Sequence, residues 1–313
     1  MVERYKKKLC LLYVAILTCA LYFLYYFFYL FFLLGNIRKV HPNISYSLEP
    51  IYSQTGLKVD LFSQANNIPK NCHDREGKKI TYLILHYTAG CYKGTISHFM
   101  TSDFNAHYVI TQKEKHIKPG YIVRLAPEKF MTRHAGQSYW GAATDLNFES
   151  IGIEHVNKGI IMHNKSEHWV PFDEKQMEAS GILVRDIAKY HNIKPQNILA
   201  HADIAFQRKS DPGPLFPWGM LYHKYGVGAW LTDEEQKQVS FEKVSLNSFL
   251  GLLKRYGYNV DTSQDVSTQK NKSAIWAFQA HFSKNLKPEL CTGIPDENDL
   301  KWIVGLLKKY IDA

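Results

Sequence analysis

The chain has 313 residues, of which 45% are hydrophobic and 21% are charged. At about 100–200 residues per domain this length suggests two domains, and the composition excludes a disordered or collagen-like chain. The net charge of +9 points to an anionic partner such as nucleic acid, a membrane surface or an acidic polymer. Five cysteines are too few for a disulfide scaffold, whereas fourteen histidines justify a search for metal ligands.

The N-terminal region carries an uncharged run of 26 residues, from Leu9 to Leu34. About 20 apolar residues span a bilayer as a helix, and the apolar core of a cleaved secretory signal is usually shorter, about 7–15 residues. We therefore expect residues 1–40 to form a transmembrane helix that anchors the chain. Cleavage of this segment and lipidation at Cys19 stay open as alternatives.

The basic residues of this region flank the apolar run on both sides. They are Arg4, Lys6, Lys7, Lys8, Arg38 and Lys39. Their distribution favours a cytoplasmic N-terminus and an exported remainder. Residues 1–40 supply +5 of the net charge of +9, and the chain has no recognisable nucleic-acid-binding motif. We therefore expect a membrane partner and no nucleic-acid partner.

The rest of the chain reads as a linker and two domains. Residues 41–78 are polar and rich in turn-forming residues, which is typical of a stalk. Strands are then predicted at residues 80–86, 107–111, 121–125 and 150–156, and a short helix at 95–101. A longer helix should begin after Asp173, the predicted N-cap, with Gln176 closing a capping box, and should run toward His191.

Strands mixed with helices predict an α/β domain over residues 79–232, with a mixed central sheet flanked by helices. Residues 240–313 contain apolar positions at helical spacing, among them Leu252, Leu253, Leu306 and Leu307. They predict a small all-α C-terminal domain.

Two histidines and an aspartate form the first candidate site. His86 ends an apolar strand, while His201 and Asp211 lie ten residues apart around a loop rich in proline and glycine. Two imidazoles and a carboxylate can hold a catalytic zinc ion and leave a fourth position open for water. The spacing alone does not distinguish such ligands from structural residues of a core and a loop.

Glu154 is a carboxylate in an otherwise apolar strand. Alternation places Ile151 and Ile153 on one face of that strand and Glu154 on the other. An acid at such a position costs free energy unless it has a partner or a role. A structural salt bridge and a catalytic function both remain open.

Several motifs stand together in a characteristic order. They are Leu83-Ile84-Leu85-His86-Tyr87-Thr88-Ala89, Arg133-His134-Ala135-Gly136, Ser150-Ile151-Gly152-Ile153-Glu154, His201-Ala202-Asp203-Ile204-Ala205 and Arg208-Lys209-Ser210-Asp211-Pro212-Gly213-Pro214. Over roughly residues 80–230 the chain resembles the zinc-dependent N-acetylmuramoyl-L-alanine amidases that share the peptidoglycan-recognition-protein fold. Ala202 and Phe206-Gln207 depart from the usual pattern of that family but leave the candidate ligands intact.

The resemblance implies a role for each candidate residue. His86, His201 and Asp211 would bind Zn²⁺. Glu154 would act as general base, and Lys209 would stabilise the oxyanion of the tetrahedral intermediate. The implied reaction is hydrolysis of the amide between N-acetylmuramic acid and L-alanine in peptidoglycan or muropeptides.

Two further histidines are candidate substrate-binding residues. His134 lies in the Arg133–Gly136 motif, and His107 starts a predicted strand. A structural, hydrogen-bonded role is the alternative for each of them.

Residues 252–258 and 274–282 resemble the small helical peptidoglycan-binding domain that often accompanies such amidases. A stabilising helical appendage is the alternative for this segment. The whole chain is then expected in the cell envelope, anchored in the inner membrane, with the catalytic domain on the periplasmic side, or secreted if the anchor is cleaved. A catalytically silent peptidoglycan-recognition protein on the same fold is the alternative to an enzyme.

Overall fold

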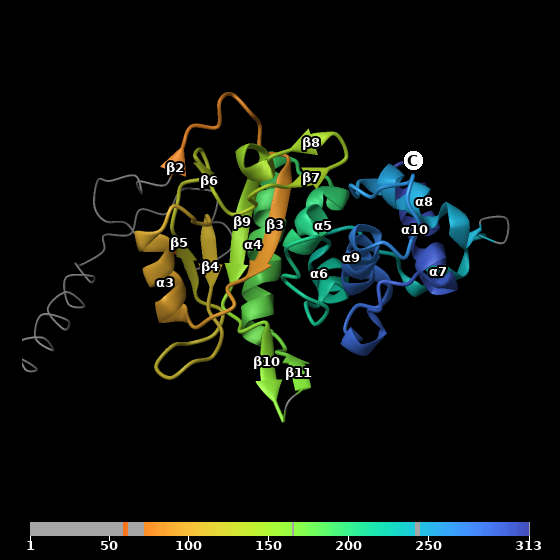
Figure 1. Cartoon of the computed structure of the whole chain (residues 1–313). Coiled ribbons are helices and arrows are strands. Elements are labelled where there is room, and N and C mark those ends of the chain that lie inside the picture. The colour runs from red at the N-terminus through yellow and green to blue at the C-terminus, as the bar shows by residue number, and fades with distance from the viewer. Residues whose placement is uncertain (1–58, 62–71, 165, 242–244, 313) are drawn as a thin grey trace, which may run out of the picture. The chain divides into compact units, whose positions relative to one another are not determined.

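The computed structural model describes residues 59–61, 72–164, 166–241 and 245–312 (Figure 1). The expected transmembrane helix within residues 1–40 and most of the expected stalk lie outside these residues. Within the described ranges, no helix is both long and apolar enough to span a bilayer.

A six-stranded sheet forms the centre of the first predicted domain. Its strand order is β1-β5-β4-β9-β3-β12. In chain order the strands are β1 (Val59–Leu61), β3 (Tyr82–Tyr87), β4 (Tyr108–Ile110), β5 (Ile122–Arg124), β9 (Ser150–His155) and β12 (Ile198–Ala200). Strands β4 and β5 are antiparallel, and the other neighbouring pairs are parallel. The predicted mixed sheet is confirmed, and the four predicted strands lie within two residues of their expected bounds. Strand β1 lies in the expected stalk at residues 41–78 but pairs with β5 in the sheet, so the stalk prediction is wrong for this part of the chain.

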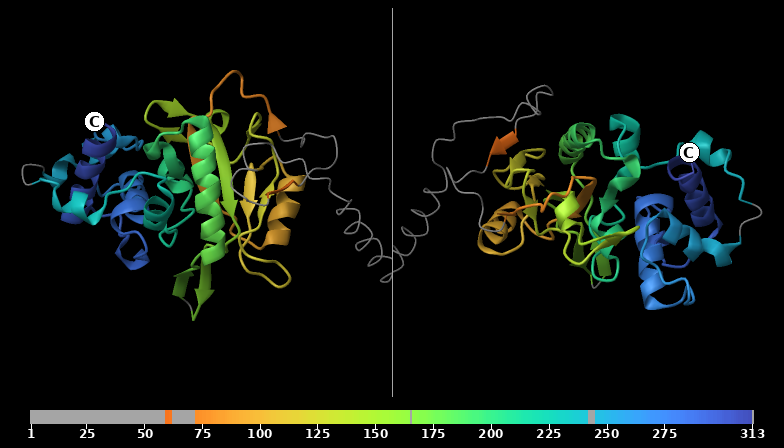
Figure 2. Two further views of the ribbon diagram at one scale, coloured as in Figure 1. Left: turned by 180° about the vertical axis from the view of Figure 1, so that it is seen from behind. Right: turned by 90° about the horizontal axis from the view of Figure 1, so that it is seen from above.

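One face of the sheet is covered by helix α4 (Glu174–His191), which lies against the strands in both views of Figure 2. Ile151 and Ile153 of β9 are fully buried in the main core. The Asp173 side chain caps α4 as predicted, because it accepts hydrogen bonds from the backbone N–H groups of Lys175 and Gln176.

The predicted role of Gln176 in a capping box is wrong. Its side chain is fully buried and donates to the backbone carbonyls of Ile110 and Val156, at 2.8 and 3.0 Å. Gln176 therefore connects α4 to the ends of two neighbouring strands through these two carbonyls.

The opposite face is covered only in part by helix α3 (Tyr92–Thr101). Phe99 of this helix packs with Val109 and Val123 in a smaller apolar cluster. Val109 and Glu154 are Cα partners in the sheet, so Glu154 shares this face. The strand ends beside this smaller apolar cluster stay accessible to solvent, and the candidate site lies at these strand ends.

Short elements complete this part of the chain. They are β2 (Cys72–His73), β6 (Met131–Thr132), β7 (Tyr139–Trp140), β8 (Ala143–Thr144), β10 (Ile160–His163), β11 (Ser166–Trp169), α5 (His201–Ala205), α6 (Trp218–Tyr225) and α7 (Asp233–Lys237), with 3₁₀ turns at Leu146–Glu149 and Pro195–Asn197.

The C-terminal segment is helical, as predicted. It contains α8 (Phe249–Tyr256), α9 (Gln269–Phe278) and α10 (Glu297–Tyr310), with a π-helical turn at Gln279–Ser283 and 3₁₀ turns at Leu246–Ser248 and Pro288–Leu290. Its apolar side chains belong to the same continuous core as those around the central sheet, and helix α9 packs against α5. The boundaries 79–232 and 240–313 stay predictions.

Candidate metal and catalytic site

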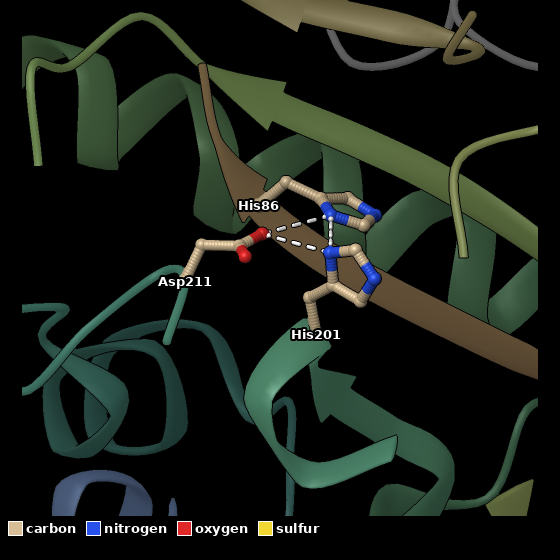
Figure 3. Close-up of side chains that lie close together, drawn as sticks. All are labelled: His86, His201 and Asp211. Atoms are coloured by element: carbon tan, nitrogen blue, oxygen red, sulfur yellow. Dashed lines mark hydrogen bonds and ion pairs between the residues drawn. The ribbon is translucent and has the colours of Figure 1, made fainter. Parts of the chain in front are cut away.

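His86, His201 and Asp211 meet at the carboxyl ends of two adjacent parallel strands. His86 lies near the end of β3, and His201 is the first residue of α5, directly after β12, which pairs with β3. The loop that follows α5 brings Asp211 beside them (Figure 3). The Nδ1 atoms of the two histidines are 3.0 Å apart, and Asp211 Oδ2 lies 3.0 Å from His86 Nδ1 and 3.1 Å from His201 Nδ1.

The second ring nitrogen of His201 decides which tautomer it adopts. His201 Nε2 lies 3.0 Å from the backbone carbonyl of Ala135. A carbonyl only accepts, so the hydrogen-bond network assigns the proton to Nε2. The lone pair on Nδ1 of His201 therefore faces Asp211 and His86.

A longer chain of hydrogen bonds assigns the tautomer of His86. Ser150 Oγ donates to the carbonyl of Leu146 at 2.6 Å and so accepts from Nε2 of His134 at 3.0 Å. Nδ1 of His134 is then unprotonated and accepts from Nε2 of His86 at 3.0 Å. The lone pair on Nδ1 of His86 therefore also faces Asp211.

Three electron-rich atoms thus converge without a proton between them, an arrangement that a cation would stabilise. Four zinc ligands at about 2.0–2.1 Å from the ion lie about 3.3 Å from one another, close to the 3.0–3.1 Å separations in this cluster. All three residues are buried and offer a ligand atom to one shared point. The donor set therefore fits a zinc ion with a fourth position open.

The electrostatic environment keeps the donors in the forms that bind metals. Burial and the neighbouring His201 lower the pKa of His86 to about 4, so that His86 is neutral near pH 7. Burial by itself would raise the pKa of Asp211, but His201 and His86 outweigh it and hold that pKa well below its usual range. Asp211 is therefore ionised, which is the form in which a carboxylate binds a metal.

Glu154 lies beside these donors with one oxygen unsatisfied. Its Oε2 atom is buried and has no hydrogen-bond partner among the described residues. Burial as the main cause and the negative charge of Asp211 as the second raise the pKa of Glu154 to about 8. A carboxyl group with a pKa near neutrality is well suited to accept and return a proton.

His134 lies across β9 because a glycine leaves room for its ring. Gly152 faces the same side as Glu154, and a Cβ atom at Gly152 would overlap the His134 ring. His134 also lines the cavity at the site. It therefore contacts both the candidate ligand His86 and the space that a substrate would enter.

His107 does not line this cavity. Its side chain is fully buried, its Nδ1 accepts from the backbone N–H of Gly152 at 3.0 Å, and its Nε2 donates to the carbonyl of Phe130 at 3.0 Å. Burial and the neighbouring guanidinium of Arg75 lower its pKa to about 3. The structure thus places His107 in the wall behind His134, as the structural alternative describes, and its contact with substrate stays a prediction.

A cavity of about 550 Å³ opens above the site. The exposed side chains of Arg133, Arg208 and Lys209 contribute to its lining, together with His98 and Phe104. Of these, the sequence reasoning singled out only Lys209. Arg208 holds the rim in place by donating to the carbonyls of Ala135 and Gln137.

Sequence reasoning also missed the groups that orient the two histidines. One is the carbonyl of Ala135 and another is the hydroxyl of Ser150. A backbone carbonyl has no side-chain signature, and a single serine in a strand does not stand out from its neighbours.

Comparisons with known proteins agree with this geometry. The sequence matches the family described as N-acetylmuramoyl-L-alanine amidase over residues 76–214. N-acetylmuramoyl-L-alanine amidase AmiD of Escherichia coli is 37% identical over 245 residues, which cover 74% of this chain and 84% of AmiD.

Two solved structures extend the similarity to the fold. The complex of E. coli AmiD with the substrate anhydro-N-acetylmuramic acid-L-Ala-D-gamma-Glu-L-Lys aligns with a TM-score of 0.65 at 35% identity, over 78% of this chain and 93% of AmiD. AmpDh3 of Pseudomonas aeruginosa in complex with anhydromuramic pentapeptide aligns with a TM-score of 0.66 at 31% identity, over 75% of this chain and 93% of AmpDh3. The chain belongs to the N-acetylmuramoyl-L-alanine amidase family.

Proposed function

We propose that this chain uses zinc to hydrolyse the amide between N-acetylmuramic acid and L-alanine in peptidoglycan or its muropeptide fragments. One observation carries this proposal: three possible metal-binding atoms converge beside a cavity that Glu154 also lines. The atoms are His86 Nδ1, His201 Nδ1 and Asp211 Oδ2. These three residues would hold the ion. Bound zinc supplies Lewis acidity, which polarises the scissile carbonyl and lowers the pKa of water.

The chain's own residues move the proton and stabilise the developing charge. The unpaired Oε2 of Glu154 takes the proton of the attacking water and passes it to the nitrogen of the leaving L-alanine. The ammonium group of Lys209, at the rim of the same cavity, stabilises the negative oxygen of the tetrahedral intermediate.

The rim of the cavity suits an anionic substrate. Arg133, Arg208 and Lys209 all contribute to it, and the stem peptide of a muropeptide carries free carboxylates. Guanidinium groups bind carboxylates with paired hydrogen bonds. The muropeptide ligands of the AmiD and AmpDh3 structures support the same class of substrate. His134 contributes to substrate binding from the wall of the cavity.

The sequence supports a location in the cell envelope. The apolar run from Leu9 to Leu34 with its basic flanks anchors the chain in the inner membrane. The part of the predicted stalk that precedes β1 links this run to the catalytic domain, which acts outside the cytoplasm, in the periplasm. The helical segment at residues 240–313 binds the cell wall.

Mass spectrometry of the products tests the proposed reaction. The full chain, purified in detergent with zinc, is incubated with sacculi and with soluble muropeptides. We expect free stem peptides that begin with L-alanine from at least one substrate, and much slower release by Glu154→Gln. Full zinc occupancy without any released peptide would instead identify a silent recognition protein.

A further inference from the structure

Asp203 is a fully buried carboxylate in helix α5, two residues after the candidate ligand His201. Its Oδ2 accepts from the backbone N–H of Ala200 at 2.7 Å and from Nδ1 of His281 at 2.6 Å. Its Oδ1 accepts from the hydroxyl of Tyr258 at 2.7 Å. Tyr258 and His281 both belong to the C-terminal helical segment, so two of these three donors come from outside the sheet domain.

The bond to Ala200 connects Asp203 to the metal site. Ala200 ends β12 and is the N-cap of α5, whose first helical residue is His201. A carboxylate at the third helical position that accepts from the N-cap N–H satisfies this donor and connects the first turn of the helix to the end of the strand. The orientation of Asp203 is therefore transmitted to the backbone that carries His201.

Both C-terminal donors are held rigidly by aromatic packing. The His281 ring is stacked between Trp218 at a centroid distance of 3.7 Å and Phe282 at 3.8 Å. Tyr258 lies edge-to-face with Trp140, with centroids 4.9 Å apart. Neither donor can turn away from Asp203 without disturbing the core that joins the two segments.

We infer that Tyr258 and His281 are positioning residues for the metal ligand His201, and that they act on it through Asp203. The C-terminal helical segment thereby sets the metal affinity of the catalytic site, independently of any contact it makes with the cell wall. This inference rests on the proposed zinc site. Loss of a group that orients a metal ligand typically weakens metal binding by about 10–100-fold.

A pair of tyrosine variants isolates the hydrogen bond from the packing. Tyr258→Phe removes the hydroxyl that bonds Asp203 and leaves the ring. Tyr256→Phe is the matched control, because Tyr256 is buried in the same aromatic cluster but its hydroxyl has no partner in the described part of the chain. We expect Tyr258→Phe to bind Zn²⁺ about 10–100-fold more weakly in competition with a chromophoric chelator, and Tyr256→Phe to match the wild type.

A second pair tests His281 by rescue. His281→Asn keeps an N–H donor near the position of Nδ1, whereas His281→Leu keeps bulk without a donor. We expect the asparagine variant to retain most of the zinc affinity and the leucine variant to lose it. The visible spectrum of bound Co²⁺ should change in Tyr258→Phe and His281→Leu, because a reoriented His201 alters the ligand geometry. If Tyr258→Phe does not fold, the two His281 variants decide.

These measurements separate this inference from the proposed function. A wild-type chain that binds zinc but cleaves no muropeptide would overturn the function, while the zinc affinities would still decide on positioning. Equal zinc affinities and identical Co²⁺ spectra in Tyr258→Phe and Tyr256→Phe would overturn the inference. A wild-type chain that binds no zinc would overturn both.

Discussion

His86 and Glu154 are direct Cα partners on the neighbouring parallel strands β3 and β9. Partners in a parallel pair present their side chains on the same face of the sheet. A candidate metal ligand and a candidate proton acceptor are thus set side by side by backbone hydrogen bonding alone. The sheet register, rather than a flexible loop, fixes their separation.

The first prediction concerns Glu154. Glu154→Gln should retain zinc, because Glu154 is not in the ligand cluster, but should lose about 10²–10⁴-fold in kcat, because an amide cannot accept the proton. Glu167→Gln, at an exposed position of β11, is the control and should keep full activity. Metal analysis and steady-state kinetics on a muropeptide measure both effects. A Glu154→Gln enzyme with near-wild-type kcat would remove the general-base role.

The second prediction concerns the protons released when zinc binds. With a pKa of about 8, Glu154 holds a proton in about nine of ten metal-free molecules at pH 7. A bound dication lowers that pKa and expels the proton. His86, whose pKa is lowered to about 4, has no proton to release.

Calorimetric zinc titrations in buffers of different ionisation enthalpy measure this release. The wild type should release more protons per zinc than Glu154→Gln at pH 7, and the difference should disappear near pH 10, where Glu154 is already ionised. Equal proton release by both proteins at pH 7 would contradict a raised pKa of Glu154.

The third prediction concerns the space above Gly152. Gly152→Ala places a methyl group where the His134 ring lies, so the bond from His86 Nε2 to His134 should break and zinc affinity should fall by about 10–100-fold. Gly251→Ala is the matched control, because a Cβ there meets no atom within 4 Å and alanine favours the helix by about 0.5–1 kcal/mol. Zinc competition and thermal unfolding report the two effects. Unchanged zinc affinity in Gly152→Ala would show that His134 does not orient His86.

The fourth prediction concerns Asp211 and metal removal. Asp211→Ala removes the only anionic donor of the cluster and should abolish both zinc binding and hydrolysis. Asp103→Ala, an exposed aspartate near α3, should leave both intact. Chelation of the wild type should lower its Tm, and added zinc at about 1,000-fold its Kd should restore about 4 kcal/mol of stability. Full zinc content in Asp211→Ala would refute its place among the ligands.

The sequence predicted the face of the sheet on which the site lies. Strand alternation placed Glu154 opposite Ile151 and Ile153, and both isoleucines are fully buried in the structure. It also predicted the Asp173 cap of α4. These features depend on neighbouring residues and on the two-residue period of a strand, so they can be read locally.

The sequence does not show which distant backbone groups form hydrogen bonds with a buried side chain. Gln176 occupies a capping-box position, yet it bonds carbonyls 20 and 66 residues away. His107 is a predicted substrate-binding residue, and its Nδ1 accepts from the backbone N–H of Gly152, 45 residues away. A buried polar group takes whichever partner the packing brings within reach, and sequence spacing carries no information about that partner.

The sequence by itself determined which residues we propose for the chemistry, because these residues stand in motifs of defined order: His86, His201, Asp211, Glu154 and Lys209. Only the tertiary structure decided how they are oriented. The histidine tautomers follow from partners 16, 48 and 66 residues apart in the chain, and Asp203 is held by a tyrosine and a histidine 55 and 78 residues further on. Hydrogen bonds act over about 3 Å in space whatever their separation in sequence, so these couplings exist only once the two segments have packed into one core.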